Sequence, residues 1–216
     1  MKTMHIDDVL DRAHVVSLPL AVRFRGITTR EALLIEGPAG WGEFAPFLEY
    51  GPAESAAWLR AGLEAAYEGF PEPVRDSIEV NATIPAVPAS EVPAVVERYP
   101  GCRTFKIKVA EKGHTLADDA ARVRAVRDAV TQRGDIPILR VDANGGWTVD
   151  EAVEAAQMMM PLDYMEQPCA TTEELAQVRG RLMRAGLFVR VAADESIRKV
   201  ADPLSLIHIS EPTRPY

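Results

Sequence analysis

The hydrophobic pattern of the chain changes its period near residue 77. Before that point, apolar residues occur in short extended segments at 15–24, 31–36 and 41–44, and residues 52–67 carry apolar side chains at helical spacing. This pattern predicts a small antiparallel sheet, with a long connection after its first strand, followed by one helix. We therefore expect a small α+β domain over residues 1–77.

After the turn residues at 70–73, extended and helical patterns alternate along the chain. We expect strands at 78–84, 105–109, 138–142, 162–166 and 188–194, with helices at 92–99, 116–130, 149–159 and 173–185. Repeated β/α units form a parallel sheet that is either open and doubly wound or closed into a barrel. Because no Gly-x-Gly-x-x-Gly segment follows a strand, we favour an incomplete TIM-type barrel of about five β/α units over residues 78–204.

Three of the expected helices begin with the same spacing of residues. Thr115, Thr148 and Thr171 each stand three residues before an acidic residue. This spacing is typical of a hydroxyl cap with a favourable negative charge at the positive end of the helix. The caps are structural, and they predict where each strand-to-helix loop ends.

The segment at 105–109 alternates apolar residues with Lys106 and Lys108. In a strand, this alternation puts both lysines on one face. An antiparallel strand with its lysines in water would give the same pattern. Three acidic residues at later strand ends favour a different interpretation, in which the lysines face the inside of a barrel.

The acidic residues Asp142, Glu166 and Asp194 each end an expected strand, about one β/α unit apart. In a β/α barrel, the carboxyl ends of the strands converge on one mouth. Three carboxylates would repel one another there unless a cation joined them. Oxygen ligands without histidine or cysteine suit Mg²⁺, or Mn²⁺, better than zinc. Each acid taken alone could equally be a helix cap or a surface charge.

A lysine inside such a mouth would lie away from water, beside a second lysine and a metal ion. All three conditions lower a lysine pKa, and a lowered pKa is what a general base needs at neutral pH. A base beside a Lewis acid suits removal of a proton next to a carboxylate, with the metal balancing the charge that accumulates. We therefore expect a small-molecule carboxylate as substrate.

Composition narrows the classes of partner. The chain has 216 residues, 47% of them hydrophobic, which is enough for a sizeable core, and its net charge is −8. A diffuse acidic balance without a Lys/Arg block argues against nucleic acid and anionic membranes as partners. Two cysteines without a spacing motif, no signal-like N-terminus and no long apolar run predict a cytoplasmic location. The oligomeric state stays open.

Four short motifs resemble those of the enolase superfamily, in its muconate-lactonizing subgroup. They are Lys-x-Lys at 106–108, Val-Asp-Ala-Asn at 141–144, Met-Glu-Gln-Pro at 165–168 and Ala-Asp-Glu-Ser at 193–196. The resemblance implies that Lys108 is the base and that Lys106 holds the substrate carboxylate. It also implies metal ligation by Asp142, Glu166 and Asp194. Asn144 and Glu195 would support this site.

Within the superfamily, residues 24–28 and 41–50 resemble the o-succinylbenzoate synthase family of menaquinone biosynthesis, of the actinobacterial type. There the N-terminal domain caps the barrel, which implies that Arg25, Gly26 and Tyr50 lie in substrate-binding loops. The implied reaction is Mg²⁺-assisted dehydration of 2-succinyl-6-hydroxy-2,4-cyclohexadiene-1-carboxylate to 2-succinylbenzoate. An N-acylamino-acid racemase or dipeptide epimerase would use the same lysines and metal.

The resemblance ends at about Leu204, and residues 205–216 depart from the family pattern. The family continues into a sixth strand with another lysine, so we expect strands six to eight and this second catalytic lysine to be missing. Such a truncated chain is expected to have little or no activity by itself. A third hypothesis is therefore an inactive fragment without metal dependence.

Overall fold

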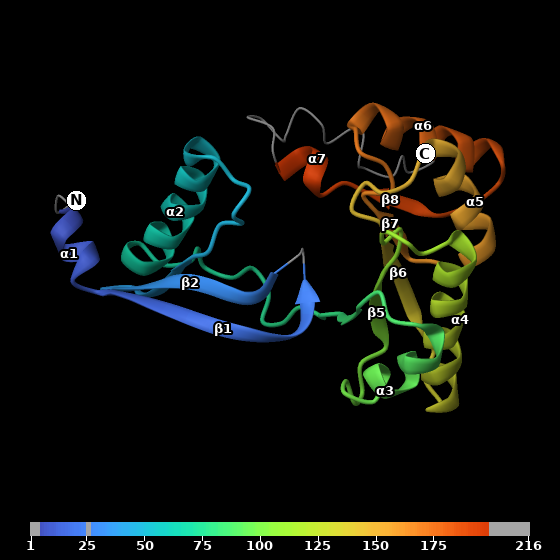
Figure 1. The fold of residues 1–216 in the computed structure, drawn as a ribbon, viewed down its shortest axis with the longest axis horizontal. Helices are drawn as coiled ribbons and strands as arrows, with labels where there is room; N and C mark the ends of the chain where they lie inside the picture. The colour runs from blue at the N-terminus through green and yellow to red at the C-terminus, as the bar shows by residue number, and fades with distance from the viewer. Residues whose placement is uncertain (1–4, 25–26, 199–216) are drawn as a thin grey trace. The chain divides into compact units, whose positions relative to one another are not determined.

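The computed structural model describes residues 5–24 and 27–198 (Figure 1). The chain divides into two compact units, one that ends at Ser77 and one that begins at Ile78. The predicted tail at 205–216 lies outside the described residues. None of the described helices combines the length and the apolar character that a membrane crossing requires.

The first unit is a three-stranded antiparallel sheet, in the order β1-β2-β3, with helix α2 packed against it. Its elements are α1 (Ile6–Leu10), β1 (Ala13–Phe24), β2 (Ile27–Gly37), β3 (Gly40–Phe44) and α2 (Pro52–Tyr67). A Cβ atom on Gly42 would lie 1.8 Å from the carbonyl oxygen of Gly62, so glycine is required where α2 crosses β3.

Two features of this unit differ from the sequence prediction. The predicted long connection between the first two strands is wrong, because pairing continues as far as Phe24 and Ile27. Arg25 and Gly26 join these strands and lie outside the described residues, so their predicted substrate contacts stay a prediction. The short helix α1 was not predicted, and only one of its residues, Val9, is buried.

The second unit is a parallel sheet of five strands in the order β4-β5-β6-β7-β8, as in an incomplete β/α barrel. The expected fold class is confirmed. Its elements are β4 (Ala82–Ile84), η1 (Ala89–Glu91), α3 (Val92–Val96), β5 (Thr104–Lys108), α4 (Leu116–Gln132), β6 (Ile138–Asp142), α5 (Val149–Met159), β7 (Tyr164–Glu166), α6 (Thr172–Arg184), β8 (Arg190–Ala192) and α7 (Glu195–Arg198).

The central elements match their predicted bounds better than the outer strands do. Strand β6 and helix α5 have the bounds that the sequence predicts. The outer strands β4 and β8 are shorter than predicted, with three residues each. Residues assigned to them by their apolar character are exposed instead: Ile78, Val80 and Phe188. Apolar character alone therefore overestimated both outer strands.

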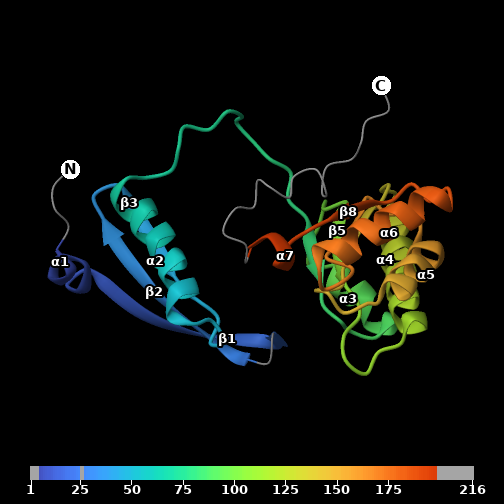
Figure 2. The ribbon, with the colours of Figure 1, turned by 90° about the horizontal axis from the view of Figure 1, so that it is seen from above.

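The two faces of the parallel sheet differ in chemistry. Phe105, Ile107, Val141 and Met165 are fully buried in one core with residues of α3 to α6. Helices α4, α5 and α6 lie on this side of the sheet (Figures 1 and 2). Since successive side chains of a strand alternate between faces, the lysines of β5 lie on the opposite face. This confirms the expected orientation of the strand.

The predicted caps of α4, α5 and α6 are all present. In each helix the N-cap threonine accepts a hydrogen bond from the third residue, whose carboxylate accepts one from the threonine backbone. These capping boxes satisfy N–H groups that would otherwise lack a partner in the first turn. They fix where each loop from the carboxyl end of a strand to the following helix ends.

Candidate active site

Strand register places the polar side chains of the sheet in one row. Lys108 of β5 pairs with Asp142 of β6, Asp142 with Glu166 of β7, and Glu166 with Ala192 of β8. Lys106 lies one layer below, opposite Arg140. The row arises because Lys108, Asp142 and Glu166 are each the last residue of their strand, and paired residues of a parallel ladder lie at the same level.

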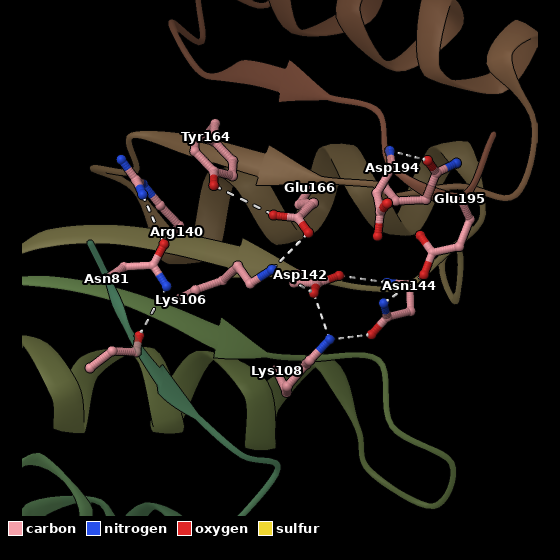
Figure 3. A network of polar contacts seen from close by, with 12 residues as sticks. Asn81, Lys106, Lys108, Arg140, Asp142, Asn144, Tyr164, Glu166, Asp194 and Glu195 are labelled. Atoms are coloured by element: carbon pink, nitrogen blue, oxygen red, sulfur yellow. Dashed lines mark hydrogen bonds and ion pairs between the residues drawn. The ribbon is translucent and has the colours of Figure 1, made fainter. Parts of the chain in front are cut away.

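The amine of Lys108 is held by two acceptors from the next strand and its loop (Figure 3). Its Nζ donates to Asp142 Oδ2 at 2.6 Å and to Asn144 Oδ1 at 2.7 Å. Asn144 in turn donates from Nδ2 to Glu195 Oε1 at 2.9 Å. Lys108, Asn144 and Glu195 therefore form a continuous hydrogen-bonded chain across the site.

The amine of Lys106 lies between two carboxylates. Its Nζ is 2.8 Å from Glu166 Oε1 and 3.4 Å from Asp142 Oδ2. Burial lowers the pKa of Lys106, but the hydrogen bond to Glu166 and the charges of Asp142 and Glu166 outweigh it, so this pKa is raised. The lowered lysine pKa expected from the sequence concerns a base beside a bound metal ion, and it stays a prediction.

The carboxylate of Asp142 is the centre of the group. Its side chain is 2% exposed, and it contacts both lysines. Its second oxygen, Oδ1, accepts a hydrogen bond from the backbone N–H of Asn144 at 3.1 Å. A buried carboxylate is stable when cations and donors surround it in this way.

Tyr164 contacts the second carboxylate oxygen of Glu166. Its hydroxyl lies 3.4 Å from Glu166 Oε2. Burial, and then the charge of Glu166, raise the pKa of Tyr164, so the phenol stays protonated and donates this contact. Tyr164 was not predicted, although its position two residues before Glu166 puts it on the same face of β7.

The carboxylate oxygens of the site are the kind of donor atom that a hard divalent cation prefers. Asp142 and Glu166 already share one cation, the ammonium group of Lys106, and both offer carboxylate oxygens. Asp194 follows the neighbouring strand, and it lies with Glu195 at the end of the group away from Lys106 (Figure 3). Over residues 5–24 and 27–198, no three Asp, Glu, His or Cys side chains are close enough to hold a metal ion. Ligation by Asp194 stays a prediction.

Tyr50 belongs to the first unit of the chain. Its ring packs edge-on against Phe47, with centroids 5.4 Å apart, and lies 5.6 Å from the ring of Trp58. These contacts hold Tyr50 in an aromatic cluster beside the start of α2. Its predicted contact with substrate stays a prediction.

Comparison with known proteins identifies both units. A family model described as enolase N-terminal domain-like matches residues 15–66, and one described as enolase C-terminal domain-like matches residues 89–209. The o-succinylbenzoate synthase of Mycolicibacterium smegmatis is 58% identical over 205 residues, which cover 94% of this chain and 60% of that protein. The chain thus spans about three fifths of the length of this curated relative.

Solved structures share the fold at lower identity. The L-Ala-D/L-Glu epimerase from Bacillus subtilis has a TM-score of 0.65 and 24% identity, and the match covers 85% of this chain and 66% of that one. An enolase superfamily member from Roseovarius nubinhibens, complexed with magnesium, has a TM-score of 0.59 and 18% identity, covering 92% and 67%. With the C-terminal family model matching more than half of the residues, the chain belongs to the enolase superfamily.

Proposed function

We propose that this chain carries the proton-abstracting site of an o-succinylbenzoate synthase-like lyase. The observation that carries the proposal is the convergence of Lys106 and Lys108 on the carboxylate of Asp142. The substrate class is inferred from the o-succinylbenzoate synthase that is 58% identical to this chain. The reaction is the dehydration of 2-succinyl-6-hydroxy-2,4-cyclohexadiene-1-carboxylate to 2-succinylbenzoate.

Lys108 is the base in this proposal. Its contacts with Asp142 and Asn144 hold Nζ in place, so a neutral amine at this position can take the proton α to the substrate carboxylate. The C–H electron pair forms the new ring double bond while the C–O bond to the hydroxyl group breaks. The proton returns from Lys108 to the departing hydroxide, which leaves as water.

Lys106 binds the substrate carboxylate in this proposal, and Asp142, Glu166 and Asp194 would hold the divalent cation. Lys106 lies one layer below Lys108 on the same face of β5, where its ammonium group can bind an anionic group of the substrate. A divalent cation held by Asp142, Glu166 and Asp194 would supply positive charge to the substrate carboxylate oxygens as the proton leaves. Because aromatisation favours the products, the site must mainly position its substrate.

Ligand binding tests the proposal without requiring full turnover. Melting temperatures of the purified chain are measured with Mg²⁺, with the product 2-succinylbenzoate, and with both. A ligand that binds the folded site raises the melting temperature by linkage. We expect a rise with Mg²⁺ and a further rise when 2-succinylbenzoate is added. Lys112→Met, which changes an exposed lysine in the loop after β5, serves as a control for Lys106→Met.

Activity measurements separate the competing reactions. Dehydration is followed by the appearance of the aromatic product, and deuterium incorporation from solvent is measured in N-acylamino acids. Deuterium incorporation without dehydration would favour the racemase alternative. A melting temperature that responds to neither Mg²⁺ nor the product would support a non-catalytic fragment. A cytoplasmic location belongs to the same proposal, and cell fractionation tests it.

A further inference from the structure

Gln167 follows Glu166 directly, and its side chain is fully buried. Its Oε1 accepts hydrogen bonds from the backbone N–H of Asp194 at 2.8 Å, and from the backbone N–H and hydroxyl of Ser196 at 3.2 and 3.0 Å. Its Nε2 donates to the carbonyl of Cys169 at 2.8 Å. One amide side chain thus connects the end of β7 to the turn after β8.

The backbone of Gln167 makes two further connections. Its N–H donates to the carbonyl of Ala192 at 2.7 Å, and its carbonyl accepts from the N–H of Gly145 at 2.7 Å. The residue has a φ of 37°, in the left-handed region that non-glycine residues rarely adopt. Gln167 therefore contacts the loops after β6, β7 and β8, which follow or contain the three predicted metal ligands.

This arrangement matters most for Asp194. The ladder between β7 and β8 ends at the pair Glu166 and Ala192, two residues before Asp194. Beyond that pair, the hydrogen bond to Gln167 Oε1 continues the connection between the two strand ends. The side chain therefore extends the sheet by one step at the level where the third carboxylate leaves it.

The amide group suits this position better than its closest analogue. A glutamate could accept from Asp194 and Ser196, but a carboxylate could not donate to the carbonyl of Cys169. It would also add a buried negative charge beside Glu166 and Asp194. A neutral group that both accepts and donates connects the loops without changing the charge of the site.

We propose that Gln167 is a positioning residue that fixes Asp194 relative to Glu166 and so sets the divalent-cation affinity of the site. This inference rests on the proposed function for the role of the cation. The fixing of the Asp194 turn by Gln167 is a separate property, and it can be measured without any metal ion.

The test uses Gln167→Met, which keeps a similar length but removes the donor and the acceptor. Gln177→Met, at an exposed position of α6, is the matched control. Hydrogen exchange of the Asp194 and Ser196 amides is measured in the metal-free chain, and Mg²⁺ affinity is measured by calorimetry. We expect faster exchange at both amides and a loss of affinity of about 10- to 100-fold, the usual effect of removing a group that orients a ligand.

Ser196→Ala provides a second, milder variant in case Gln167→Met does not fold. It removes one of the donors to Gln167 Oε1 and should change exchange and affinity in the same direction, by less. Unchanged exchange of the Asp194 amide in a folded Gln167→Met chain would overturn the inference, as would unchanged Mg²⁺ affinity. If Gln167→Met does not fold, an Ser196→Ala chain identical to the parent in both measurements would overturn it.

A parent chain that binds no Mg²⁺ would contradict the cation part of the proposed function. The hydrogen-exchange data by themselves would then test the positioning role of Gln167. Faster exchange at Asp194 and Ser196 in the variant would support it, and equal exchange would contradict it.

Discussion

The guanidinium of Arg122 and the carboxylate of Asp119 form an ion pair of 2.6 Å in which each side chain is only 1% exposed. Arg122 also donates to the carbonyl of Lys108 at 3.0 Å, and Asp119 accepts from the N–H of Ala110 at 2.8 Å. The pair therefore holds the end of β5 and the loop that follows it. This ion pair therefore supports the strand end that carries Lys108, the base of the proposed reaction.

Arg122→Met should destabilise the chain strongly, because it leaves the carboxylate of Asp119 buried without its cation. We expect a loss of about 3–5 kcal/mol in the free energy of unfolding, measured by urea denaturation. The control is Arg181→Met, which breaks an ion pair with Asp150 whose side chains are 43% and 82% exposed. That change should cost about 0–1 kcal/mol. Equal losses in the two variants would contradict the buried role of Arg122.

Glu151→Gln should make the free energy of unfolding depend less on pH in the acidic range. Hydrogen bonds from the backbone N–H and the hydroxyl of Thr148 hold the pKa of Glu151 below its usual value of 4.5. A lowered pKa in the folded state stabilises the chain above the unfolded value, and this stabilisation is lost as pH falls through the folded value. The difference in unfolding free energy between parent and variant should thus be largest near neutral pH.

The measurement for Glu151 is urea denaturation at a series of pH values, with Glu154→Gln as control. Glu154 is an exposed residue of the same helix. A difference between parent and Glu151→Gln that stays constant from neutral pH down to well below pH 4.5 would contradict the prediction.

Cys169 should resist alkylation in the folded chain. Burial raises its pKa to about 11, and its side chain is fully buried. At pH 8, a thiol with this pKa is ionised in about one molecule in a thousand, and the thiolate is the reactive form. Iodoacetamide labelling followed by mass spectrometry should modify Cys102 first and Cys169 only after denaturation. Equal labelling of both in the native chain would contradict this.

Lys106→Met should increase the stabilisation by Mg²⁺. The change removes the cation that Asp142 and Glu166 share, so their repulsion should lower the melting temperature without metal. Added Mg²⁺ should then raise the melting temperature more than in the parent chain. Lys112→Met should leave both values unchanged. A smaller Mg²⁺ effect in Lys106→Met than in the parent chain would contradict this prediction.

Local signals predicted the central elements, and tertiary contacts decided the rest. Helix α5 begins at a capping box and β6 is a mostly apolar segment that ends at an acid, so sequence alone located their ends. At the outer strands, the extent of pairing depends on the neighbouring strand. Apolar residues such as Val80 and Phe188 give no information about where that pairing stops.

The sequence predicted the charged residues of the candidate site and two supporting residues, Asn144 and Glu195, but it gave no sign of the roles of Gln167 and Arg122. Lys108 and Asp142 could be placed together because their spacing repeats with the β/α units. In the sequence, Gln167 is only one residue of the Met-Glu-Gln-Pro motif. Its burial could not be predicted, because it depends on loops that are far apart in sequence. Arg122 cannot be told apart in sequence from Arg124, an exposed residue of the same helix, and its neighbours in space, such as Val87, identify it as buried.

The shared register of β5, β6 and β7 limits how this protein can change in length. Lys108, Asp142 and Glu166 lie at one level of the ladder, and a one-residue slip would turn a whole strand to its other face. An insertion inside a strand would therefore move a lysine or a carboxylate into the helix-packed core. Insertions outside the strands leave the row intact, so evolutionary length variation in this fold should be confined to the segments between β5, β6 and β7.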